Sequence, residues 1–215
     1  GERANFIRLF IAISILLLIA RLLTFKILTL LIFSTSIMLY LVITLDTRQG
    51  NVKNRYFDQI YNALKSKTIK EINNNNSYTP MYVNAYDLFK KNKLLGVGAG
   101  SYPIKSYENF RINKKINGYN ILPNTHPHQF HFEILATLGL PGYLFIFLFL
   151  FYFLFKSLRF YIKKKDIINL SSFLFIFVFC IPLLPMGSFF TTYGASMFWL
   201  NFSIMNIHNF KNLNY

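Results

Sequence analysis

Apolar and polar positions divide the chain into five long apolar stretches, short basic segments and one long polar segment. A helix that crosses the hydrocarbon core of a bilayer needs about 20 mostly apolar residues. The five stretches are too long and too uniformly apolar for amphipathic helices on the surface of a soluble protein. We therefore predict five transmembrane helices, at residues 5–20, 26–45, 134–155, 167–184 and 189–207.

The polar segment, residues 46–130, is far too long for a tight turn and is expected to carry its own structure. Apolar residues at helical spacing predict a helix over residues 53–72. Pro80 suits a first helical turn and favours a second helix over residues 81–91. The four asparagines at 73–76 predict a flexible break between these two helices.

Lysine and arginine in short loops mark the cytoplasmic side of a membrane protein. Basic residues flank the turns after the first, third and fifth predicted helices: Arg21, Lys26, Lys156, Arg159, Lys163, Lys164, Lys165 and Lys211. Residues 46–130 then lie on the outer face, which is also where the first helix begins. The predicted fold is all-α and multi-pass, with two transmembrane helices in residues 1–45, one large, mainly helical extracytoplasmic loop over residues 46–130, and three transmembrane helices and a cytoplasmic tail in residues 131–215.

Composition supports a membrane class, because 53% of the residues are hydrophobic and 19% are aromatic. The formal charge of +15 has two interpretations: binding to anionic lipids or phosphate-bearing substrates, or a general bias toward lysine, asparagine and isoleucine. Nothing resembles a nucleic-acid-binding motif, so no nucleic-acid partner is expected. The single cysteine, Cys180, cannot form an intramolecular disulfide within the chain. The chain begins with Gly1 and has no signal-peptide pattern, so we expect it to be an internal piece of a longer protein.

Candidate chemistry concentrates just before the third predicted helix. Three of the four histidines fall within six positions: His126, His128 and His131. Asn124 or Thr125 can cap a helix with Pro127 in its first turn, which would place His128 near the helix N-terminus and His131 one turn later on the same face. That end of a helix favours bound phosphate and a neutral imidazole, which can accept a proton from a hydroxyl. The alternative is that the histidines are polar residues at the membrane interface.

Three other patterns bear on the chemistry of the chain. The histidine spacing lacks the carboxylate partner of a recognisable zinc motif, so no metal is expected. The glycines of residues 94–102 lack the strand–helix setting and the Lys-Ser/Thr of a phosphate-binding loop, so we expect a structural turn. Arg3 lies at the outer mouth of the first helix and Arg8 about 7 Å deeper along it. A cation at that depth either serves a functional site or extends back to the interface.

Three separated pieces together resemble the O-antigen ligase and polymerase family. They are Gly-Glu-Arg-Ala at residues 1–4, Leu-Leu-Gly-Val-Gly at residues 94–98, and His-Pro-His-Gln at residues 126–129 followed by Gly-Leu-Pro-Gly at residues 139–142. The chain departs from the family at Glu2, where serine is common, at Lys93, where proline is common, and at Gln129, where asparagine is common. The family often has an arginine near residues 78–82, where this chain has none. The residues that could replace it are Arg48, Arg55 and Arg111.

The resemblance implies a metal-independent glycosyltransferase of the inner membrane, without a cofactor. The donor would be a glycan on a polyprenyl (undecaprenyl) diphosphate, and the acceptor a hydroxyl of lipid A core, of a growing glycan or of a protein. By analogy His128 is the general base and Arg3 neutralises the departing diphosphate, while His126, His131 and Arg8 contact substrate. Membrane lipids would surround the helices. A transporter or flippase component and a non-catalytic scaffold for polysaccharide export remain the alternatives, and the 215-residue chain alone is expected to be inactive.

Overall fold

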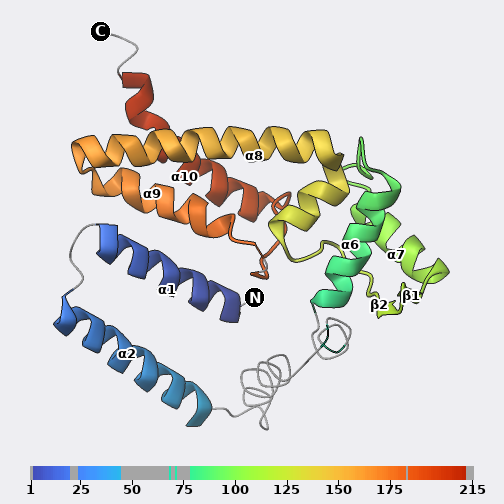
Figure 1. The fold of residues 1–215 in the computed structure, drawn as a ribbon, viewed down its shortest axis with the longest axis horizontal. Coiled ribbons are helices and arrows are strands. Elements are labelled where there is room, and N and C mark those ends of the chain that lie inside the picture. The colour runs from blue at the N-terminus through green and yellow to red at the C-terminus, as the bar shows by residue number, and fades with distance from the viewer. Residues whose placement is uncertain are drawn as a thin grey trace.

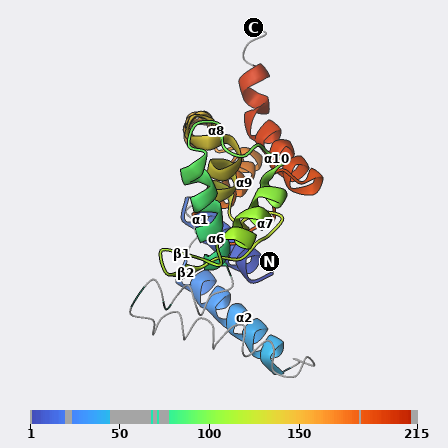
Figure 2. The ribbon, with the colours of Figure 1, turned by 90° about the vertical axis from the view of Figure 1, so that its right-hand side faces the viewer.

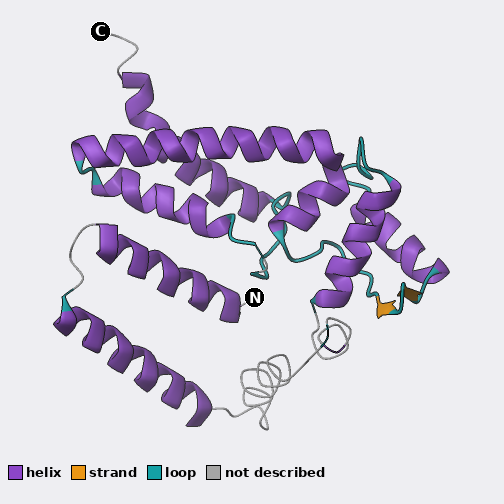
Figure 3. Ribbon diagram, viewed as in Figure 1, coloured by secondary structure: helices purple, strands orange, loops and turns teal. Residues whose placement is uncertain are grey.

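The computed structural model describes residues 2–19, 24–44, 68, 71, 78–182 and 184–211. Helices dominate this part of the chain (Figure 3). The elements, in chain order, are α1 (Glu2–Ile19), α2 (Phe25–Thr44), α6 (Thr79–Lys91), α7 (Tyr102–Ile112), β1 (Lys115–Ile116), β2 (Tyr119–Asn120), α8 (Phe130–Lys164), α9 (Ile167–Phe179) and α10 (Thr192–Lys211). Within the described residues, the all-α prediction missed a short antiparallel hairpin, in which Asn117 and Gly118 form a left-handed turn, and no helix was predicted where α7 lies.

A helix lies in each of the five predicted apolar ranges, as α1, α2, α8, α9 and α10. Within the described residues, α8 is the one helix long and apolar enough to cross a membrane. The helix predicted over residues 81–91 is present as α6, with Pro80 in its first turn. The helix predicted over residues 53–72 lies almost entirely outside the described residues, and the asparagine break at 73–76 lies wholly outside them.

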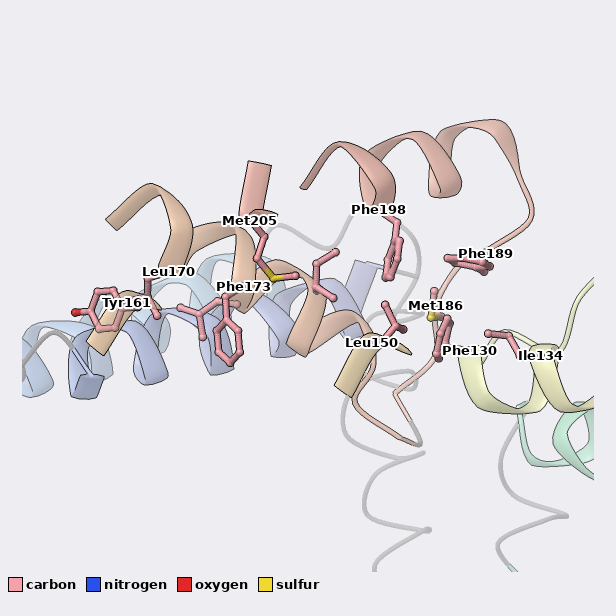
Figure 4. Packing of buried hydrophobic residues seen from close by; sticks show 12 residues of the cluster. Phe130, Ile134, Leu150, Tyr161, Leu170, Phe173, Met186, Phe189, Phe198 and Met205 are labelled. Carbon is pink, nitrogen blue, oxygen red and sulfur yellow. The ribbon is translucent and has the colours of Figure 1, made fainter. Parts of the chain in front are cut away.

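The helices α8, α9 and α10 pack side by side, with α1 against the other side of α9 (Figure 1). Their core is apolar and rich in aromatic rings (Figure 4). A buried polar contact fixes the register of the three helices: the Ser157 hydroxyl donates to Asn169 Oδ1 at 2.9 Å, and Asn169 Nδ2 donates to the Met205 carbonyl at 2.7 Å. Large apolar side chains on α8 remain exposed in the chain alone, such as Phe145 at 72% and Phe151 at 62%. An apolar outer face of this kind suits contact with lipid.

The helices α6 and α7 form a separate small layer with the hairpin, beside the α8–α9–α10 bundle (Figure 2). Its centre is a buried amide network. Asn84 Nδ2 donates to the Ser106 hydroxyl at 3.0 Å and to the Leu122 carbonyl at 3.1 Å, and Asn109 Nδ2 donates to Asn84 Oδ1 at 2.8 Å. These bonds hold α6, α7 and the segment after β2 in one arrangement.

A kink at Gly139 divides α8 into a short first part and a long second part (Figure 1). Gly139 has a φ of 70°, and Pro141 has no N–H to donate to the Thr137 carbonyl. The carbonyls freed at the kink accept from residues 94–100, which we call the glycine loop: Val97 N–H donates to Ala136 at 2.8 Å and Gly98 N–H donates to Thr137 at 2.9 Å. In return, Leu140 N–H donates to the Lys93 carbonyl at 2.7 Å. The glycine loop is therefore a structural turn, as predicted, and it docks the small layer onto the kink.

Candidate active site

The segment from residue 121 to residue 129 carries His126 and His128, and the small layer holds it in place. Leu122 N–H donates to the Pro80 carbonyl at 3.3 Å, and Asn124 N–H donates to the Ser106 hydroxyl at 3.0 Å. The segment then passes from the small layer to the start of α8. Its two histidines consequently lie where α6, α8 and the loop before α10 meet.

His128 has a left-handed backbone, with a φ of 56°, which is uncommon for a residue other than glycine. Its carbonyl accepts from Met186 N–H at 2.7 Å, a bond to the segment that connects α9 with α10. Its ring lies 4.0 Å from the ring of His126 and meets Tyr78 edge-on at 5.6 Å, both between centroids. Burial lowers the pKa of His128, and a hydrogen bond with the Met186 backbone acts in the opposite direction. The imidazole is therefore neutral at neutral pH, the form that accepts a proton.

The predicted helix cap is wrong. Gln129, in extended conformation, caps α8: its side-chain oxygen accepts from Phe132 N–H at 2.9 Å. The helix thus begins at Phe130 rather than near Pro127, and His128 precedes it. Asn124 and Thr125 instead bond locally, Thr125 N–H donating to Asn124 Oδ1 at 2.8 Å. Hence His128 and His131 do not share a helix face, and the histidine that accompanies His128 is His126.

The structure separates His131 from the other two histidines. Its Nδ1 lies 3.1 Å from the Tyr143 hydroxyl, and its Nε2 lies 2.8 Å from the Cys180 carbonyl. Both ring nitrogens are thus engaged in connecting the start of α8 to the end of α9. We assign His131 a structural role in the tertiary packing.

His126 is half-buried, and its Nε2 is buried without a hydrogen-bond partner among the described residues. Its Nδ1 lies 3.2 Å from the Thr125 hydroxyl. Burial, and next the neighbouring His128, lower the pKa of His126 to about 4. Two adjacent neutral imidazoles therefore stand at the junction of α6 and α8 at neutral pH.

The two arginines lie on α1. Arg3 is in its first turn, and its side chain lies outside the described part of the structure. Arg8 is half-buried: Nη2 donates to the Leu184 carbonyl at 2.9 Å, and Nη1 donates to Asn5 Oδ1 at 3.3 Å. Because Leu184 and Met186 belong to the same short segment, Arg8 and His128 are attached to one stretch of backbone.

A cavity of about 540 Å³ lies between α1, α9 and the segment that leads into α10. Arg8, Asn5 and Thr191 supply polar groups, and most of the other lining side chains are apolar, including Leu9, Phe175 and Met197. A half-buried arginine at the wall of an apolar cavity suits a ligand that combines an anionic group with a hydrocarbon chain.

Sequence reasoning missed three residues near the histidines. Tyr78 is the N-cap residue of α6 and Tyr82 lies four residues later, a spacing that signals one face of a helix. Glu133, 3% exposed, accepts from the Ser188 hydroxyl and from Phe189 N–H, the latter at 2.8 Å. No sequence pattern connected Glu133 with residues 188 and 189, because their contact depends on the tertiary fold.

One comparison with known families gives a match. A family model described as O-antigen ligase matches residues 1–147, which include α1, α6, the glycine loop, both neutral histidines and the kink of α8. No curated protein matches the chain.

Proposed function

Because the chain belongs to the O-antigen ligase family, a membrane-associated family with an enzymatic role in O-antigen processing, we propose that it forms part of a glycosyltransferase of the bacterial inner membrane. The enzyme transfers a glycan from a polyprenyl diphosphate to an acceptor hydroxyl on lipid A core, on a growing glycan or on a protein. Five transmembrane helices and an outer-face loop over residues 46–130 belong to the same proposal, and the reaction uses no metal ion.

The observation that carries the proposal is the placement of His128. A neutral imidazole lies two residues before the start of α8, the longest apolar helix among the described residues. Its carbonyl is bonded to Met186, two residues from the backbone that anchors Arg8. Met186 and Arg8 both line a cavity with largely apolar walls, so the proton acceptor is connected through Met186 to a cation at the cavity wall. A proton acceptor and a cation are the groups that glycosyl transfer from a lipid diphosphate requires.

In the proposed reaction, His128 takes the proton of the acceptor hydroxyl as its oxygen bonds to the anomeric carbon of the donor sugar. The bond between that carbon and the diphosphate oxygen breaks, and the diphosphate leaves with the electron pair. Arg3 and Arg8 stabilise the negative charge that gathers on the leaving group. His126, whose ring lies 4.0 Å from that of His128 between centroids, contacts the substrate beside the general base.

Glycan transfer by the full-length protein in its host tests the proposal, with His128→Ala and Arg3→Ala compared at matched membrane abundance. We expect both variants to lose transfer and to accumulate lipid-linked glycan. His208→Ala is the matched histidine control, because this residue lies in the last turn of α10, at the opposite end of the bundle (Figure 1). Normal glycan in the His128→Ala variant would overturn the proposal and favour a transporter or a scaffold.

A further inference from the structure

The guanidinium of Arg8 has an unused donor. Two of its nitrogens donate to Leu184 and Asn5, and its Nε is buried without a partner among the described residues. The ion pairs Lys91–Asp87 and Lys105–Glu108 do not involve Arg8. A donor atom of a half-buried cation that is shielded from water and has no partner is costly unless an anion binds to it.

The phenol of Tyr82 is a second unused donor. Its hydroxyl is buried and has no hydrogen-bond partner within the described residues. Its ring is fixed between two others, stacked on Phe132 at 5.1 Å and on Tyr78 at 6.5 Å between centroids. Burial, and next Tyr78, raise the pKa of the phenol, while the nearby charge of Arg8 opposes the rise. Tyr82 therefore keeps its proton and stays a donor throughout the physiological pH range.

We propose that Arg8 and Tyr82 together form a phosphate-binding site, in which the Nε–H and the phenol O–H donate to oxygens of the diphosphate head group of the lipid-linked donor. This inference rests on the proposed function. The Arg8 charge acts on the Tyr82 phenol, and each group has a buried donor atom without an acceptor among the described residues. Such a pair of donors matches a ligand that only accepts hydrogen bonds, as phosphate oxygens do. The aromatic contacts from Tyr82 to Tyr78 and from Tyr78 to His128 place this site next to the general base.

The cavity beside Arg8 identifies the ligand as a lipid phosphate rather than free phosphate. Its walls are largely apolar, so a phosphate bound at Arg8 can extend a hydrocarbon chain along Leu9 and Phe175. Arg8 on α1 is a single point of attachment for the phosphate. Tyr82 adds a second, neutral donor from another element, α6, and two donors fix the orientation of the head group relative to His128.

Binding of farnesyl diphosphate to the purified full-length protein in detergent tests the site. Tyr82→Phe removes a hydroxyl that makes no hydrogen bond within the described structure, so the variant should fold normally. A hydrogen bond to a charged group is worth about tenfold or more in affinity. We expect Tyr82→Phe to bind farnesyl diphosphate about tenfold more weakly, and Tyr86→Phe, the exposed tyrosine one turn further along α6, to bind it as the wild type does.

Farnesol, which has no phosphate, should bind equally to the wild type and to Tyr82→Phe. Wild-type affinity of Tyr82→Phe for farnesyl diphosphate would overturn the inference, as would an equal loss of affinity for farnesol. Displacement of farnesyl diphosphate by an equal concentration of phosphatidylglycerol would also overturn it, because the site would then bind bilayer phosphate. His128→Ala separates the two proposals: loss of transfer with unchanged farnesyl diphosphate binding supports the proposed function whatever Tyr82→Phe shows.

Discussion

Gly96 is the position at which one added methyl group should separate the glycine loop from α8. An ideal Cβ there would lie 2.4 Å from the carbonyl carbon and oxygen of Thr137, and 2.6 Å from Leu138 N. These are backbone atoms, which cannot turn aside as a flexible side chain can. Gly96 also has a φ of 65°, a left-handed conformation that alanine adopts at a cost. Gly96→Ala must therefore distort the loop, the kink of α8, or both.

The expected cost follows from two contributions. The left-handed conformation costs an L-residue about 1–2 kcal/mol. Moving the loop away from α8 weakens the bonds from Val97 N–H to Ala136 and from Gly98 N–H to Thr137, at a net of about 1 kcal/mol each. We expect Gly96→Ala to lower the free energy of unfolding by about 3–4 kcal/mol.

The same loop provides graded controls. Gly98 has a φ of 86°, but the nearest atom to its Cβ would be the Ser101 hydroxyl oxygen at 3.6 Å, so Gly98→Ala should cost only the conformational contribution, about 1–2 kcal/mol. For Gly100, no atom of the described residues lies within 4 Å of the added Cβ, so Gly100→Ala should be close to neutral.

The apparent unfolding temperature of the full-length protein in detergent, read by size-exclusion chromatography after heating, ranks the three variants. We expect Gly96→Ala to be lowest, Gly98→Ala intermediate and Gly100→Ala near the wild type. Equal unfolding temperatures for Gly96→Ala and Gly100→Ala would refute the close docking of the glycine loop on α8.

Two further predictions concern buried polar groups near the site. Lowering the pH from 6.5 to 4 should destabilise the protein through His126, because the unfolded imidazole takes up its proton near 6.5 while the folded one, with a pKa lowered by burial and next by His128, resists protonation until about 4. His126→Asn should make the fall in unfolding temperature over this pH range shallower, and an unchanged slope would argue against burial of the ring. Glu133→Ala should cost about 2–3 kcal/mol, because the Ser188 hydroxyl and Phe189 N–H lose their acceptor. Glu133→Gln keeps one acceptor oxygen and should cost less, so equal unfolding temperatures for the two Glu133 variants would contradict this account.

The sequence predicted the positions of α1, α2, α6, α8, α9 and α10, because each is marked by a long apolar run or by a proline in its first turn. It did not predict α7, although Pro103 lies in the first turn of that helix. It did not predict how α8 is built. Residues 130–133 are partly polar, so the predicted helix began at residue 134, whereas Glu133 is buried against Ser188. The sequence analysis did not predict the kink at Gly139 and Pro141, where the freed carbonyls are satisfied by residues 97 and 98, which are distant in sequence. Only the tertiary fold decides that the helix kinks and continues.

The sequence predicted only part of the candidate site, because the rest of the site depends on tertiary contacts. His126 and His128 stood out as neighbours in sequence and are neighbours in space. The pairing of His128 with His131 was wrong because it assumed that the helix began near Pro127, whereas the extended backbone and side chain of Gln129 cap it at Phe130. The charge of Arg8, on α1, acts on the phenol of Tyr82, on α6, and local periodicity carries no information about such an approach between distant elements.

The segment from residue 184 to residue 189 explains how the site keeps its shape. Its backbone accepts from Arg8, donates to the His128 carbonyl and donates to Glu133, so α1, the histidine segment and α8 are all attached to a single short piece of chain. A left-handed backbone at a non-glycine residue such as His128 costs about 1–2 kcal/mol and persists only where its surroundings impose it. The bond from Met186 N–H to the His128 carbonyl and the helix cap formed by the next residue, Gln129, impose it here. A movement of the 184–189 segment would therefore change the direction of the imidazole and the position of the Arg8 guanidinium together, which couples the proton acceptor that we propose to the cation that we propose for the leaving group.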